Sequence, residues 1–185
     1  MPLNFVPLLM RIRRVPVQEA APKRAGSAIG KLVETPQDLA MTVLRVTLGA
    51  VMFVHASQKV FGWFGGPGIE GTLQGFTGKM GIPMPLAILV VLAEFLGSIG
   101  LIVGFLGRIA ALGILSVMVG AIALVHHRFG FFMNWMGAQP GEGFEYHLLA
   151  IAMALAVIIR GSGALSVDSW ITCAREKNRE APAGV

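Results

Sequence analysis

Long apolar runs separated by glycine- and proline-rich turns dominate the chain. Four runs are long enough, or nearly so, to cross a bilayer as helices, and they cover residues 39–64, 85–106, 108–126 and 144–159. The last run is the shortest of the four. The hydrophobic pattern therefore predicts an all-α protein, a four-helix transmembrane bundle.

The first run carries charged residues on one side of its predicted helix. At about 100° per residue, Arg45, His55 and Lys59 fall within a sector of roughly 120°, together with Gly49 and Met52. A charge near the bilayer centre costs roughly 2.5–3.5 kcal/mol on insertion scales. We therefore expect this face to meet protein or a polar cavity.

The ends of the chain differ in composition from its centre. Residues 1–34 are expected to form a flexible basic tail, residues 35–172 the membrane domain, and residues 173–185 a charged tail. Thr-Pro-Gln-Asp at 35–38 predicts the first helix start, with Thr35 as the cap and Pro36 at the first helical position.

Composition and charge place the chain in a membrane. It is 55% hydrophobic and 14% charged, with a mean hydropathy of +0.71. Eleven basic residues lie in the tails and the second connection: Arg11, Arg13, Arg14, Lys23, Arg24, Lys31, Arg108, Arg160, Arg175, Lys177 and Arg179. The other connections hold only Lys79 and Arg128. This asymmetry predicts that both termini are cytoplasmic. It favours contact with anionic lipid over nucleic acid.

The chain has a single cysteine, Cys173. An intrachain disulfide is therefore impossible, and a thiol oxidoreductase that works through its own dithiol is excluded.

Ionisable side chains gather in the predicted outer half. At about 1.5 Å per residue, His55 and Glu94 both lie roughly 14 Å deep, and Lys59 about 8 Å. These three residues are the candidate proton or ligand site. Five more residues form a candidate outer mouth, where aromatic rings can stack a flat ligand: His126, Glu145, Tyr146, Phe132 and Trp135.

A purely structural role is the alternative. Glu94 would then pair with Lys59 or His55. In the inner half Arg45, near Arg108 and Asp168, would pair with Asp168 or with carbonyls at helix ends. Because the His and Glu residues show no tight ligand spacing, no metal site is expected.

Five stretches of the membrane domain form a recognisable set: HASQKVFGWFGGPG, Glu94 followed by GSIGLIVGFLGRIAA, HHRFGFFMNW, FEYHLLAIA and GSGALSVD. Taken together, they are similar to motifs of the DoxX family of small bacterial membrane proteins. Two positions depart from the family pattern. Ala56 stands where glycine is usual, and Ser162 stands where proline is common.

The resemblance implies a multi-pass protein of the bacterial inner membrane. Some relatives are subunits of quinone-linked sulfur oxidation, such as thiosulfate:quinone oxidoreductase, and others are associated with oxidative-stress systems. We therefore expect an oxidoreductase subunit with quinone as a possible cofactor and a soluble or membrane redox partner. A non-catalytic anchor or assembly subunit, or a pathway for protons or small solutes, remains open.

Overall fold

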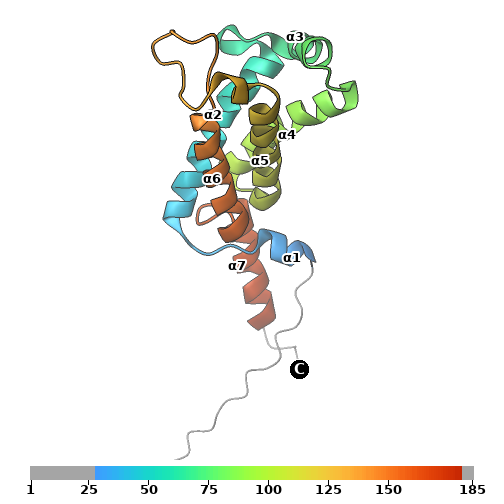
Figure 1. Ribbon diagram of the computed structural model, residues 1–185. Coiled ribbons are helices and arrows are strands. Elements are labelled where there is room, and N and C mark those ends of the chain that lie inside the picture. The colour runs from blue at the N-terminus through green and yellow to red at the C-terminus, as the bar shows by residue number, and fades with distance from the viewer. Residues whose placement is uncertain (1–27, 181–185) are drawn as a thin grey trace, which may run out of the picture.

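Every regular element in the described part of the chain is a helix. The computed structural model describes residues 28–180, with side chains from 30 to 178. The long helices are α2 (Leu39–Phe61), α4 (Met84–Val103), α5 (Gly107–Leu124) and α6 (Glu145–Arg160). At one end lies α3 (Gly68–Gln74), and at the other lie α1 (Ala28–Val33) and α7 (Val167–Glu180) (Figure 1). The prediction of an all-α fold is confirmed over these residues.

Short helical turns complete the chain. A 3₁₀ turn at Trp63–Gly65 follows α2, and a π-helical turn at Gly75–Lys79 extends α3. A second 3₁₀ turn, His126–Phe129, follows α5 and leads into the long loop before α6.

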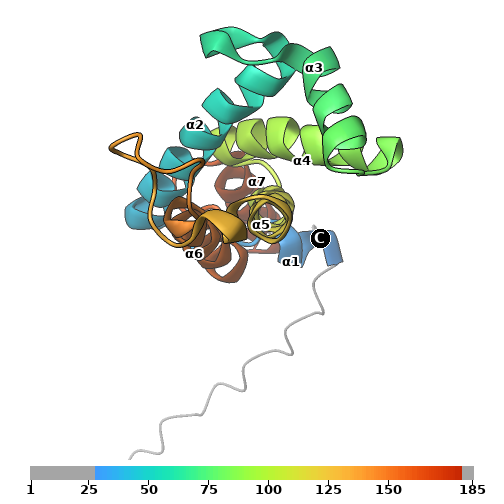
Figure 2. The same cartoon turned by 45° about the horizontal axis from the view of Figure 1, so that its top comes forward.

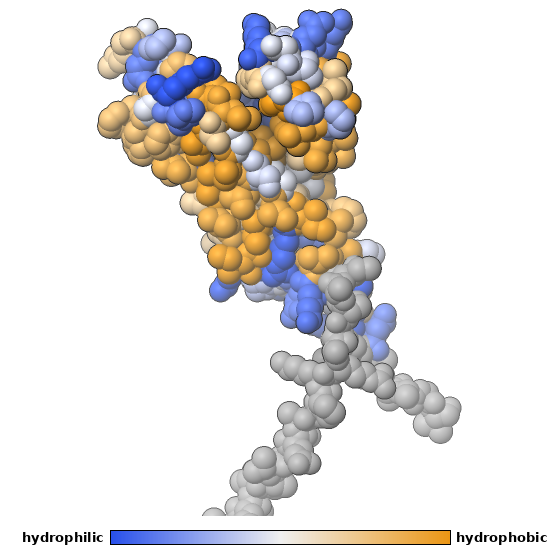
Figure 3. All heavy atoms as spheres, turned by 45° about the vertical axis from the view of Figure 1, so that its right-hand side comes forward, coloured by the Kyte–Doolittle hydropathy of each residue, from blue (hydrophilic) through white to orange (hydrophobic). Residues whose placement is uncertain are grey.

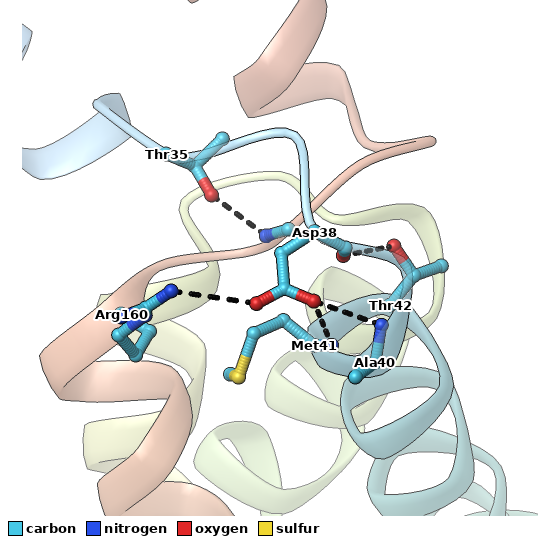
Figure 4. A network of polar contacts seen from close by, with 7 residues as sticks. Thr35, Asp38, Ala40, Met41, Thr42 and Arg160 are labelled. Atoms are coloured by element: carbon cyan, nitrogen blue, oxygen red, sulfur yellow. Dashed lines mark hydrogen bonds and ion pairs between the residues drawn. The ribbon is translucent and has the colours of Figure 1, made fainter.

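The start of α2 differs from the expectation. Asp38, not Thr35, is the cap, and its Oδ1 accepts from the backbone N–H groups of Ala40 at 2.9 Å and Met41 at 3.3 Å (Figure 4). The Thr35 hydroxyl instead accepts from the N–H of Gly163 at 2.6 Å. Thr35 therefore ties the segment after α6 to the start of α2.

The four long helices pack side by side. α2 contacts α4 and α6, and α5 contacts the same two helices (Figures 1 and 2). The shared core includes Leu48, Leu101, Ile114 and Val157, one residue from each helix. At Gly49 a Cβ would lie 3.0 Å from the backbone nitrogen of Ile102, so glycine allows the close approach of α2 and α4.

Three helices, α2, α4 and α5, are long and apolar enough to cross a membrane. Apolar side chains form a band between more polar ends of the molecule (Figure 3). α2 ends at Phe61, before the predicted residue 64, because Gly62 takes the left-handed conformation (φ 73°) that terminates helices. α6 has 16 residues, or about 24 Å at the usual helical rise, against about 30 Å for a hydrocarbon core.

A buried carboxylate fixes the turn between α4 and α5. Leu106, a non-glycine residue with φ 49°, precedes α5. Asp168 is 1% exposed, and it accepts from the N–H groups of Leu106 at 2.9 Å and Gly107 at 3.0 Å. The Ser162 hydroxyl donates to the same carboxylate at 2.6 Å. Asp168 lies on α7, and it thus accepts hydrogen bonds from N–H groups at the start of α5 that have no partner within their own helix.

The two ends of the chain pack against this region. Residues 28–33 of the predicted N-terminal tail form α1, where Arg108 donates to the carbonyls of Lys31 at 2.9 Å and Glu34 at 2.6 Å. The Thr172 hydroxyl of α7 donates to the carbonyl of Val33 at 3.0 Å. Helix α7 also extends into the predicted C-terminal tail, as far as Glu180. Residues 1–27 and 181–185, with the rest of both predicted tails, lie outside the described residues.

Candidate functional site

A lysine and a glutamate meet between α2 and α4. Lys59 Nζ lies 2.6 Å from Glu94 Oε1 and 2.5 Å from Oε2. Glu94 is 1% exposed, whereas the Lys59 side chain keeps 29% of its surface exposed. Of the two cations predicted near Glu94, Lys59 forms the ion pair. The carboxylate is therefore enclosed and its partner faces a space that other molecules can reach.

Neighbouring elements hold this pair in place. The Thr72 hydroxyl of α3 donates to the Lys59 carbonyl at 3.1 Å. Phe95, the residue after Glu94, stacks on Phe53 with ring centroids 6.0 Å apart and meets Phe61 edge-on at 5.5 Å. These aromatic contacts join α4 to α2 on both sides of the ion pair along α2.

The ion pair borders a cavity of about 220 Å³. Its walls come from α2, α4, α5, α6 and the loop before α6. The ionisable residues that line it are His55, Lys59, Glu94, His126, Glu142, Tyr146 and His147. Three methionines, Met52, Met118 and Met133, supply much of the apolar wall.

Four rings form a chain along one side of the cavity. The centroid separations are 5.8 Å between His55 and Tyr146, 5.4 Å between Tyr146 and His147, and 4.1 Å between His147 and His126. The Tyr146 hydroxyl donates to Met52 Sδ at 3.5 Å. His126 Nδ1 lies 2.8 Å from the Glu142 carbonyl, so that nitrogen carries a proton and donates.

His147 is the residue that the sequence analysis did not single out. It is 6% exposed, and its Nδ1 is buried without a hydrogen-bond partner. A buried polar atom left in this way costs roughly 1–3 kcal/mol. His147 also lines the cavity, so the residue contacts a molecule that occupies it.

Three residues of the predicted outer mouth do not line this cavity. Glu145 Oε1 accepts from Trp135 Nε1 at 3.3 Å, outside the cavity lining. Trp135 is 84% exposed and Phe132 69% exposed. The other two, His126 and Tyr146, do line the cavity.

The inner charged residues form a separate cluster near α7. Arg45 is 0% exposed and donates to the carbonyls of Leu101, Ile102, Ser162 and Leu165. Its partners include carbonyls at the negative end of α4, where a cation is favoured. Among the described residues the ion pairs are Lys59–Glu94 and Arg160–Asp38. Arg45 and Asp168 therefore form no ion pair with each other, and each makes hydrogen bonds to backbone groups instead.

The described side chains include no group of three or more His, Cys, Asp or Glu residues placed to hold a metal ion. The cavity has room for a small polar group, to which the partly exposed Lys59 ammonium can donate hydrogen bonds.

The sequence model of the DoxX family matches residues 40–127. This stretch of the chain is therefore similar to the DoxX family. The matched stretch covers α2 from its second residue, α4 and α5, with Lys59, Glu94 and His126. The part of the chain that contains Tyr146 and His147 on α6 lies beyond it.

A named relative covers more of the chain. The chain is 29% identical over 134 residues to "Putative oxidoreductase CatD" of Bacillus subtilis (strain 168). The alignment covers 72% of the chain and 88% of that relative. No solved structure matches the chain at a significant level.

Proposed function

We propose that this protein is a four-span subunit of a quinone-linked oxidoreductase in the bacterial inner membrane. The observation that carries the proposal is the Lys59–Glu94 ion pair beside a cavity that His147 and His126 also line. The membrane-crossing length of α2, α4 and α5, the family, and the oxidoreductase name of a relative support it.

In this proposal α6 is the fourth span and both termini are cytoplasmic. The four long helices pack side by side, and α6 runs between two that are long enough to cross. The excess of basic residues in the tails and the second connection supports a cytoplasmic position for the α7 end. The cavity then opens toward the periplasmic side, and the Arg45 cluster lies toward the cytoplasm.

The cavity residues have a defined chemical task. A quinone accepts two electrons and two protons to become a quinol. The Lys59 ammonium donates hydrogen bonds to a carbonyl oxygen of the ring, while Glu94 holds the ammonium in position. His147 and His126 line the same cavity and are the proposed proton donors to the ring.

The electrons come from a redox partner in this proposal, because the chain has one cysteine and therefore no dithiol of its own. The outer loop offers a surface for such a partner. Phe132, Trp135 and Met136 are 69%, 84% and 93% exposed. The same surface supports the second candidate, a non-catalytic anchor that holds a redox enzyme at the membrane.

The test is whether quinone stays with the purified protein. The wild type, extracted in mild detergent, should carry quinone in stoichiometric amounts after washing. His147→Leu should lose it, whereas His127→Leu, outside the cavity, should retain it. Equal traces of quinone in all three proteins would refute the proposed site and leave the anchor function.

A further inference from the structure

A second hollow adjoins the cavity and opens along the side of the molecule. We define it as the α4–α5 groove, with a volume of about 690 Å³. Figure 3 shows the molecule hollowed between two lobes at its upper end. The groove and the cavity share Lys59, Glu94, Val117, Ala121 and His126, so they adjoin each other at the ion pair.

The groove exists because α4 and α5 touch along only part of their length. They meet where a Cβ on Gly97 would lie 3.3 Å from the Ala110 carbonyl oxygen, near the turn between them. Farther from that turn the groove lies between them, and Phe76, Met80 and Ile82 form its wall beside α3. Its α5 side extends from Ile109 to Leu124, which is about 22 Å at the helical rise.

The groove is apolar except at its end. Leu89, Leu112 and Leu124 line it and are 60%, 54% and 55% exposed. The charged lining residues are Lys59 and Glu94, where the groove joins the cavity. A molecule that fits this outline has a polar head and a long apolar chain.

The cavity alone is small for such a molecule. At about 220 Å³ it falls below the roughly 300–1,000 Å³ of most ligand pockets. It has room for a head group, and the rest of the molecule needs the adjoining space.

Gly120 also suits a groove that holds a long apolar chain. It lies inside α5 without a positive φ, and a Cβ there would meet nothing within 4 Å. Neither backbone conformation nor close packing therefore requires glycine, although glycine destabilises a helix relative to alanine. A larger residue at this position would fill the groove that Gly120 lines.

We propose that the α4–α5 groove binds the apolar tail of a membrane-soluble quinone and admits it laterally from the bilayer, with its head at the Lys59–Glu94 pair. This inference rests on the proposed function, because it assigns the tail of the molecule whose head occupies the cavity.

The test compares a short-tailed and a long-tailed quinone with the same ring. Binding to purified protein in detergent is measured, with concentrations expressed as mole fraction in the micelle. Wild type should bind the long-tailed quinone at least about tenfold more tightly. Gly120→Leu and Ser116→Leu should each abolish that preference and leave short-tailed binding within about twofold of wild type.

Val119→Leu is the matched control, because Val119 is 52% exposed on α5 but does not line the groove. It should bind both quinones as wild type does. Ser116→Leu fills the groove one turn earlier and serves if Gly120→Leu does not fold.

Equal affinity for both quinones in wild type would overturn the inference, and so would a preference that neither groove variant changes. Either result would mean that the groove holds ordinary lipid chains and not the quinone tail. The proposed function would stand in that case, because the ring still binds. If wild type binds neither quinone, both proposals fail.

Discussion

Lys59 on α2 and Glu94 on α4 form an ion pair in which both carboxylate oxygens accept from one ammonium group, at 2.6 and 2.5 Å. Breaking a buried pair by removing one partner typically costs about 3–5 kcal/mol. Because Lys59 is 29% exposed, part of that cost is relieved by solvent. The pair is thus strong enough to orient Lys59 and open enough to act on a bound molecule.

Arg45→Leu should impair folding more than it changes quinone binding. Arg45 donates to four carbonyl groups at the α7 end, and hydrogen bonds to charged groups contribute about 1.5–3 kcal/mol each. We expect membrane abundance to fall severalfold while quinone bound per folded molecule stays normal. Arg175→Leu, on the exposed part of α7, is the control. Normal abundance with lost binding would contradict this assignment.

His147→Leu should separate stability from function. The variant removes a buried, unpartnered nitrogen, so the free energy of unfolding should hold or rise by about 1 kcal/mol. Quinone affinity should fall by about tenfold, which is 1.4 kcal/mol. Thermal unfolding and quinone titration in the same detergent measure both. A lower Tm with unchanged affinity would make His147 a packing residue.

Reporter fusions test the proposed topology. Fusions after Lys31 and after Glu176 should both report cytoplasm, because the basic residues concentrate in the two tails and the second connection. A periplasmic signal from either position would show that α6 does not cross the membrane in the proposed way.

Regular helical geometry is enough to predict the all-α fold and part of the candidate site. The rise per residue predicted that Glu94 lies at a similar depth to His55 and close to Lys59. In the structure Lys59 forms the ion pair, because its long side chain extends from a shallower backbone position to the depth of Glu94. The spacing of apolar runs likewise predicted the all-α fold. Both features follow from the geometry of one helix or of two neighbouring helices, which the sequence pattern defines.

The misjudged and missed features depend on tertiary contacts. Thr35 and Asp38 both have capping chemistry, and contact with Gly163 decides that Asp38 is the cap. His147 follows Tyr146 directly, but the rotation of α6 decides that it faces the cavity while Glu145 faces Trp135. The four carbonyl partners of Arg45 could not be foreseen because they come from segments whose path the sequence pattern does not define.

The central claim is that Glu94 belongs to a binding site and is not merely one half of a structural pair. The most direct test is a double-mutant cycle with Glu94→Gln and Lys59→Met, measured for thermal stability and quinone affinity in detergent. We predict that Glu94→Gln stays folded, since Lys59 reaches solvent, and loses quinone binding by at least about tenfold, and that adding Lys59→Met does not restore binding. Strong coupling in stability, with quinone affinity unchanged in Glu94→Gln, would contradict the account.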